Sequence, residues 1–335
     1  MMTKKNIIGT VLTGAAICIA LVYFLPVQTQ SKQEATVDKI ILASYQGDTA
    51  TMVYLAEELG YFQQQGLDVE FLNYEAGKLA ADALIAGKAD IATSADSVFV
   101  SNSFAHPELR ILSTIAIFKN NGLLVRKDKC SNILKDMKGK KIGVTRKSTG
   151  EYNLSVLLKF NALQMNDIEL VDLKPSEIVE ALVEGDIDAG FTWEPNLYNA
   201  KKALNENAMI FKNDVPEIRF LLLSKSRWIE KNPDVAARFI KALRRAEIYI
   251  EQDPEKIRTF AMQKFGYTKD FMAASWQDHR FVIRLSQSLL NILDNHAKWR
   301  MEQGLTDAEM MPNYLDYIYA DALHEAKPDA VTFIR

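Results

Sequence analysis

Four short polar turns stand where apolar strands are expected to end, and their side chains could bind a small ligand. They combine hydroxyl, carboxylate and glycine residues, which can donate to an oxyanion or accept from an amine. In open α/β sheets, ligands bind outside the carboxyl ends of the strands, where free helix N–H groups point at them. The residues of these turns that we predict to bind a ligand are Tyr45, Gln46, Gly47, Asp48, Thr49, Ser94, Asp96, Ser148, Thr149, Gly150, Trp193 and Glu194.

The turn Ser148-Thr149-Gly150 follows the strand-like stretch "KKIGVT" and begins an expected helix over residues 148–160. Its two hydroxyls, the N–H of Gly150 and the positive end of the helix dipole suit a carboxylate, a sulfonate or a phosphate. The alternative is an ordinary N-cap, in which Ser148 or Thr149 caps the helix without touching a ligand. The residue types alone allow both interpretations.

Three carboxylates also stand at the ends of expected strands. Glu194 follows an apolar strand and adjoins Trp193, so it could accept a hydrogen bond from an amine, an amidine or an aminopyrimidine beside an aromatic wall. Asp48 and Asp96 hold the same kind of position. For all three, the alternative is a carboxylate that stabilises the start of its own helix. Tyr45 either stacks on a ligand ring or covers an internal interface.

The sequence contains no motif for covalent catalysis, with neither G-x-S-x-G nor G-x-G-x-x-G. Its four histidines lack the spacing of metal ligands, and Cys130 is the one cysteine beyond the N-terminal segment, so we expect no metal site and no cofactor. Cys130 is expected to be structural. The 40 basic and 43 acidic residues are well mixed, which disfavours a nucleic-acid partner. We therefore predict that the protein binds its ligand without converting it, and that it is not an enzyme.

The elements that must position these turns occur twice along the chain. Residues 39–62 predict a strand, a turn and a helix, and residues 66–94 add a strand, a helix and a third strand. Residues 140–192 repeat this order. The stretch "DALIAGKADIATS" (82–94) aligns with "EALVEGDIDAGFT" (180–192), with identical Ala, Leu, Gly and Asp residues at four positions. We predict an α/β protein with two similar lobes, and the alternative is coincidence between two ordinary doubly wound segments.

Further apolar stretches connect and follow these halves. Residues 109–118, 122–127 and 218–228 are predicted strands and candidate crossings between the lobes. From residue 232 to the end the pattern is mostly helical and is expected to pack on the first lobe. With 335 residues, of which 48% are hydrophobic, the chain is long enough for more than one buried core.

The N-terminal segment is distinct from the rest of the chain. Lys4 and Lys5 precede an apolar run over residues 7–25, which Pro26 closes. This pattern predicts a signal peptide or an N-terminal membrane anchor, and the length of the run with poor cleavage sites after it favours the anchor. Basic residues before the run place the body outside the cytoplasm.

Five stretches carry a resemblance to a known family. They are "GYFQQQGLDVEF", "ALIAGKADIATS", "DMKGKKIGV", "STG" and "ALVEGDIDAGFTWEP", within residues 39–228. With them the chain resembles the extracytoplasmic solute-binding proteins of ABC importers for nitrate, sulfonates, taurine and thiamine-pyrimidine precursors, the SsuA/THI5-like and NMT1-like family. The stretches indicate the family more specifically than they indicate the ligand.

The resemblance implies a two-lobed type II periplasmic-binding-protein fold, in which each lobe is a doubly wound sheet with flanking helices. It implies a signal peptide or anchor with its linker over residues 1–35, lobe 1 over 36–125, lobe 2 over 126–217, and the return strand and C-terminal helices of lobe 1 over 218–335. It also implies hinge closure on a small polar organic ligand (a sulfonate, or a taurine-like or aminopyrimidine-like molecule) and delivery to ABC permease and ATPase subunits. We expect a monomer in the periplasm or on the outer face of the cytoplasmic membrane.

The resemblance places the ligand-contacting loops on the four turns named above. The Glu of "WEP" resembles the acidic residue with which pyrimidine-precursor binders contact an amino group. Two features depart from the family: Asp48 and Thr49 stand where a proline is usual, which argues against nitrate, and the long apolar run replaces the usual signal or lipobox. The alternatives to an importer component are a membrane-anchored ligand-sensing receptor and an enzyme on the same fold.

Overall fold

The computed structural model describes residues 37–129, 137–212, 217–277 and 279–333. Residues Val37–Arg335 form one compact unit. The signal peptide or anchor expected over residues 1–35 and the cysteine at position 130 lie outside the described residues. None of the described helices has both the length and the apolar character that crossing a bilayer requires.

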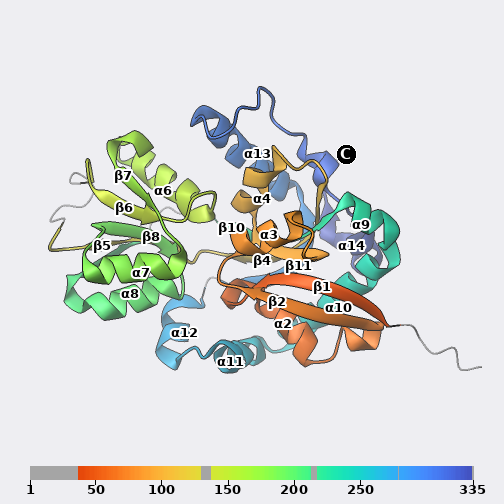
Figure 1. Cartoon of the computed structure of the whole chain (residues 1–335). Helices are drawn as coiled ribbons and strands as arrows, with labels where there is room; N and C mark the ends of the chain where they lie inside the picture. Colours follow the sequence, from red (N-terminus) through yellow and green to blue (C-terminus); the bar gives the residue numbers. More distant parts are fainter. Residues whose placement is uncertain (1–36, 130–136, 213–216, 278, 334–335) are drawn as a thin grey trace, which may run out of the picture. The chain divides into compact units, whose positions relative to one another are not determined.

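Within the described residues, the larger of two sheets has seven strands in the order β12-β11-β4-β10-β3-β1-β2. Figure 1 labels β1, β2, β4, β10 and β11 of this sheet. β1 runs parallel to β2 and β3, whereas β10 is antiparallel to both β3 and β4. The sheet is therefore mixed. Its strands are β1 (Asp38–Tyr45), β2 (Leu67–Tyr74), β3 (Ile91–Ala95), β4 (Leu109–Phe118), β10 (Ile218–Lys225), β11 (Arg280–Ser286) and β12 (Val331–Thr332).

The smaller sheet has five strands in the described part of the chain, in the order β7-β6-β8-β5-β9. β6 runs parallel to β7 and β8, and β5 is antiparallel to β8 and β9. Its strands are β5 (Asn121–Arg126), β6 (Lys141–Val144), β7 (Glu169–Asp172), β8 (Ala189–Trp193) and β9 (Ala208–Phe211).

Helices flank both sheets. Those of the smaller sheet are α6 (Thr149–Phe160), α7 (Pro175–Glu184) and α8 (Asn196–Leu204). Those that pack with the larger sheet are α2 (Thr51–Glu58), α3 (Gly77–Ile85), α4 (Asp96–Ser103), α9 (Ser226–Lys231), α10 (Pro233–Gln252), α11 (Pro254–Phe265), α12 (Lys269–Ser275), α13 (Gln287–Glu302) and α14 (Asp321–Ala326). Short 3-10 turns are η1 (Asp48–Ala50), η2 (Gln63–Gln65), η3 (Met165–Asp167), η4 (Asn205–Asn207), η5 (Tyr314–Tyr317) and η6 (Pro328–Ala330).

Alternating side chains of the strands build the cores. In β5, Leu123 packs into a cluster with Leu154 and Leu158 of α6, while its neighbour Leu124 packs with Ile178 of α7 on the opposite face. The smaller sheet therefore carries α6 on one face and α7 with α8 on the other, as Figure 1 shows. Burial on both faces explains why the central strands read as continuous apolar runs.

The internal repeat predicted from the sequence is confirmed. The strands β2-β1-β3 of the larger sheet and β7-β6-β8 of the smaller sheet have the same order and the same parallel direction. Asp90 accepts from the N–H of Ile41 at 2.9 Å, and the matching Asp188 accepts from the N–H of Lys141 at 2.9 Å. Each aspartate thus ties the start of the third strand to the first strand of its own sheet.

The matching glycines have a physical reason as well. Gly87 ends α3 with φ +74°, and Gly185 ends α7 with φ +84°. Both lie in the left-handed region, which glycine adopts without the steric penalty of a Cβ atom. The repeated stretch therefore encodes the same local structure in both sheets, the end of a helix followed by the start of a strand.

The C-terminal tail packs on elements of the larger sheet. α10 is amphipathic and buries Phe239, whose ring stacks on Phe62 at 4.6 Å between centroids. The tail also contributes β11 and β12, which the mostly helical pattern did not predict. β5 pairs within the smaller sheet from Asn121 onward, and the division of the chain into lobes at residues 125 and 217 remains a prediction.

Candidate ligand-binding site

A small cavity lies between elements of the two sheets. It offers about 40 Å³ to the centre of a water-sized sphere. The walls of the cavity are therefore close together. The lining side chains are Tyr45, Thr49, Gly77, Lys78, Ala95, Val98, Phe118, Asn120, Asn121, Ser148, Thr149, Trp193, Ile218 and Phe220.

Much of this lining is aromatic. Tyr45, Phe118, Phe220 and Trp193 all face the cavity. The ring of Phe220 contacts Tyr45 and Phe118 edge to face, with centroids 6.0 and 6.2 Å apart. Such walls exclude water and would pack around the apolar body of a ligand.

Three helices begin at the wall of the cavity. Gly77 starts α3, Ala95 precedes α4, and Ser148 precedes α6. The N-cap residues of α3 and α4 are alanines, which have no side chain that can cap the helix. The positive ends of the three helix dipoles therefore favour a negatively charged group in the cavity, whereas Lys78 is paired with Asp82 at 2.9 Å.

Ser148 and Thr149 both line the cavity, and their contact with a ligand remains a prediction. The Oγ of Ser148 accepts from the N–H of Gly150 at 3.0 Å. Ser148 is therefore also the N-cap of α6, the role that the alternative interpretation gave it. The Oγ1 of Thr149 lies 2.7 Å from the Oγ of Ser97 on α4, joining the two sides of the cavity. The N–H of Gly150 is used by the cap and does not face the cavity.

Asn120 and Asn121 were missed by the sequence reasoning. Asn121 is 3% exposed and lines the cavity, yet neither its amide oxygen nor its amide nitrogen has a hydrogen-bond partner among the described residues. The Oδ1 atom of Asn120 is also unpartnered there. A buried polar group without a partner costs free energy, so these atoms point to a ligand. The signal in the sequence was a pair of asparagines between two apolar strands.

Only some residues of the first predicted turn, Tyr45 to Thr49, line the cavity. Tyr45 and Thr49 line the cavity, whereas Gln46 is exposed and its N–H bonds the backbone of Tyr74. At Gly47 a Cβ atom would lie 2.3 Å from the Tyr45 ring, so glycine is required for the ring to fold back over the turn. Burial, and secondarily the charge of Asp48, raises the pKa of Tyr45, which keeps its hydroxyl protonated.

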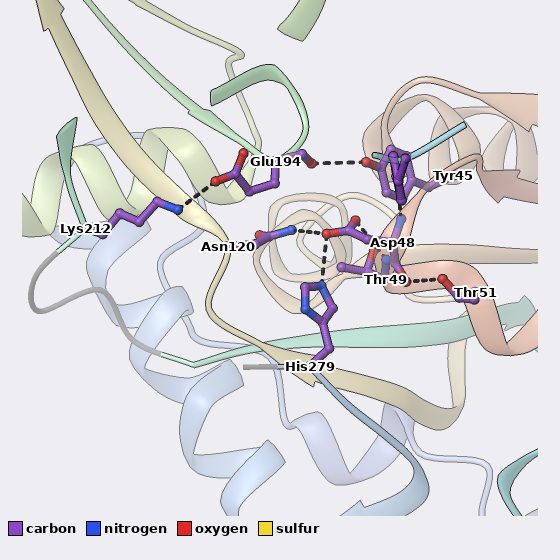
Figure 2. Close-up of polar contacts among 9 residues, drawn as sticks. Tyr45, Asp48, Thr49, Thr51, Asn120, Glu194, Lys212 and His279 are labelled. Atoms are coloured by element: carbon purple, nitrogen blue, oxygen red, sulfur yellow. Dashed lines mark hydrogen bonds and ion pairs between the residues drawn. The ribbon is translucent and has the colours of Figure 1, made fainter. Parts of the chain in front are cut away.

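Asp48 belongs to an internal network instead of the cavity wall (Figure 2). Its fully buried carboxylate lies 2.9 Å from the Nε2 atom of His279 and accepts from the Nδ2 of Asn120 at 2.9 Å and from the N–H of Thr49 at 2.9 Å. The ring of His279 stacks on Trp276. Asp48 therefore holds Asn120, which does line the cavity, from behind.

The carboxylate of Glu194 points toward Lys212 (Figure 2), and Glu194 is not part of the cavity lining. Its carboxylate pairs with the Nζ atom of Lys212 at 2.6 Å and accepts from the N–H of Tyr198, in the first turn of α8. The alternative interpretation, a carboxylate at the start of its own helix, accounts for these contacts. The backbone oxygen of Glu194 accepts from the hydroxyl of Tyr45 at 3.4 Å, which joins the two sides of the site.

Ser94 and Asp96 support the cavity from below. Ser94 donates to the backbone oxygen of Gly77 at 2.9 Å, and buried Asp96 accepts from the N–H groups of Arg219 and Ser97. Neither side chain is part of the lining. In the part of the chain that the structure describes, no three His, Cys, Asp or Glu side chains gather as a metal site would require.

Two buried groups near α4 give opposite pH dependences of folding stability. Burial raises the pKa of Asp96 from 3.8 to about 6, which stabilises the fold below pH 3.8 and is lost as the pH rises through 6. Burial, helped by Arg300 and Arg219, lowers the pKa of His296 from 6.5 to about 3, which stabilises the fold above pH 6.5 and is lost as the pH falls toward 3.

We therefore expect Asp96→Asn to lose stability on acidification from pH 7 to pH 4 more steeply than the wild type, because the opposing contribution of Asp96 is removed. Urea unfolding at the two pH values measures the difference. Equal slopes for the wild type and the variant would mean that Asp96 titrates at its ordinary pKa.

The architecture is that of the periplasmic-binding-protein fold, which confirms the predicted fold class. The alkanesulfonate-binding protein SsuA of Xanthomonas axonopodis pv. citri, solved with bound MOPS, has a TM-score of 0.72 to this chain at 17% sequence identity. The match covers 84% of this chain and 98% of that chain. At this identity the likeness shows the fold alone.

The chain belongs to the NMT1/THI5 like family, whose model matches residues 48–257, and the predicted family is confirmed. A candidate aliphatic sulfonates-binding protein of Bacillus subtilis (strain 168) is 28% identical over 204 residues, which are 58% of this chain and 60% of that relative. The match therefore spans less than two thirds of that relative. The 4-amino-5-hydroxymethyl-2-methylpyrimidine phosphate synthase of Aspergillus parasiticus is 24% identical over 288 residues, 78% of this chain and 81% of the enzyme.

Proposed function

We propose that this chain is the solute-binding component of an ABC importer, and that its cavity holds a small organic oxyanion with an apolar body, such as an alkanesulfonate or a taurine-like molecule. Family membership and the named function of the Bacillus relative support the class of protein. The aromatic walls and the three helix starts support the class of ligand.

The observation that carries the proposal is the amide of Asn121. It is buried, lines the cavity and has neither its donor nor its acceptor engaged by the described residues. A sulfonate or carboxylate oxygen would accept from its Nδ2 atom, and an amino group on the same ligand would donate to its Oδ1 atom. In this proposal the carboxylate of Glu194, which pairs with Lys212, does not contact the ligand.

Transport by such a protein requires that the ligand shift an equilibrium between open and closed forms. The cavity is lined from both sheets, and the contacts Ser97–Thr149 and Tyr45–Glu194 close over it. A ligand therefore makes its full set of contacts in the closed form alone, and its binding energy shifts the population toward that form. A permease with its ATPase subunit would recognise the closed form. An extracytoplasmic location and tethering through residues 7–25 belong to the same proposal.

Isothermal titration calorimetry with ethanesulfonate, taurine and MOPS tests the ligand class. We expect at least one of them to bind with micromolar or tighter affinity, and ethanol and ethanolamine, which lack the sulfonate, to give no heat. Propionate separates a sulfonate preference from a general preference for oxyanions. Heat from none of these anions would contradict the proposal.

A second candidate function, an enzyme, is favoured by one observation, the similarity to the Aspergillus synthase over most of both chains. Incubating the protein with the molecule it binds, followed by mass spectrometry of that molecule, decides between them. An unchanged mass supports the carrier, and a new product supports the enzyme.

A further inference from the structure

A cluster of three rings joins the two sides of the site at a distance from the cavity. Tyr152, on α6, places its ring centroid 3.9 Å from that of His296 and 5.0 Å from that of Trp299, both on α13. The contact with Trp299 is edge to face, at 86°. We call these three residues the aromatic clasp. None of them lines the cavity.

The clasp is mechanically coupled to the cavity at both ends. Tyr152 follows Thr149 by three residues on α6, so the two lie within one turn of a rigid helix. On the other side, α13 packs against α4, whose first turn contributes Val98 to the cavity wall. Any movement that separates α6 from α4 and widens the cavity must therefore also pull Tyr152 away from α13.

The contact is formed by packed rings, and His296 is 6% exposed beside the ring of Tyr152. Packed aromatic pairs contribute attraction beyond the area that they bury. Because the contact forms when the lobes are together and is lost when they part, this attraction acts on the closed form alone.

We propose that Tyr152 is a closure latch, a positioning residue that sets the fraction of closed protein without touching the ligand. The inference rests on the proposed function, because it assumes that the lobes open and close over the cavity. Weakening the latch raises the apparent dissociation constant by reducing the population that can hold the ligand. Tyr152 would thus tune affinity independently of ligand chemistry.

The test measures small-angle X-ray scattering of the ligand-free protein, followed by calorimetry with ethanesulfonate. We expect Tyr152→Ala to have a larger radius of gyration than the wild type and, where ethanesulfonate binds, a dissociation constant about tenfold higher. Tyr152→Phe keeps the rings and should match the wild type in both measurements. Trp299→Ala removes the clasp from the other side and should reproduce the expansion, which guards against misfolding of a single variant.

The matched control is Phe160→Ala, which removes an aromatic ring from the same helix at a site 72% exposed to solvent. It should change neither the scattering nor the affinity. Identical scattering for the wild type, Tyr152→Ala and Trp299→Ala would overturn the latch, whatever binds. If the two variants expand and ethanesulfonate binds to none of the proteins, the latch stands and the choice of a sulfonate ligand fails.

Discussion

Replacing Asn121 by alanine should weaken ligand binding about 30-fold and leave the folded protein at least as stable as the wild type. The two effects separate because the amide of Asn121 is buried without a partner among the described residues. Its backbone pairing with Trp193 in the sheet does not depend on the side chain. Removing the amide takes away a ligand contact and also a desolvated polar group, whose burial costs about 1–3 kcal/mol. Calorimetry and thermal unfolding of the same preparation measure both effects.

The control is Asn161→Ala, at the end of α6. Its Nδ2 atom donates to the backbone oxygen of Leu157 at 2.8 Å, away from the cavity. This variant should show the reverse behaviour, with a loss of about 1 kcal/mol in stability and no change in affinity. If Asn121→Ala bound ligand like the wild type, or if it were strongly destabilised, the amide of Asn121 would not be a ligand group.

Replacing Asp48 by alanine should lower the free energy of unfolding by about 3 kcal/mol, because three buried groups lose their shared acceptor. These are the N–H of Thr49, the amide of Asn120 and the Nε2 atom of His279. Ligand affinity should fall as well, since Asn120 lines the cavity and is held in place by Asp48. Urea unfolding, with calorimetry at a temperature where the variant is folded, measures both quantities.

Asp48→Asn is the graded control. It keeps one oxygen acceptor, and the unpartnered Oδ1 atom of Asn120 and Nδ1 atom of His279 leave room for a rearranged set of hydrogen bonds. Its loss of stability should therefore be smaller than that of Asp48→Ala. A protein with Asp48→Ala that is as stable as the wild type but unable to bind would show that Asp48 contacts the ligand, as the sequence analysis predicted.

Much of the fold could be predicted from the sequence because the repeated residues act on neighbouring elements. Gly87 and Gly185 allow their helices to end, and Asp90 and Asp188 each accept a hydrogen bond from the adjacent strand. β11 could not be foreseen, because its pairing with β4 is between segments far apart in the chain and it lies among helices. A short strand in such a place has no local signal that distinguishes it.

The candidate site was predictable at the level of turns but not of side chains. Strand ends and helix starts brought Tyr45, Thr49 and Trp193 to the cavity, because sheet geometry fixes where the carboxyl ends of strands meet. Whether a carboxylate in such a turn faces a ligand depends on partners distant in sequence. The carboxylate of Asp48 contacts the imidazole of His279, and that of Glu194 pairs with the ammonium of Lys212.

The same argument explains why Asn121 was missed. Asparagine has no motif that marks it as a ligand group, and its position at the start of β5 gives it a role only when elements of the two sheets come together around it. Its significance comes from burial and from the absence of a partner among the described residues, and both are properties of the folded chain. Residues of this kind are identified in the folded protein as buried polar side chains of the cavity wall that lack a hydrogen-bond partner.

Native mass spectrometry of the protein mixed with ethanesulfonate, taurine and MOPS in competition tests the central claim most directly. We expect a one-to-one complex with one of the three for the wild type, and loss of most of that complex for Asn121→Ala under the same conditions. The wild-type chain without any bound sulfonate, or the same complex in equal amount for Asn121→Ala, would contradict the assignment of this cavity as the site of a small organic oxyanion.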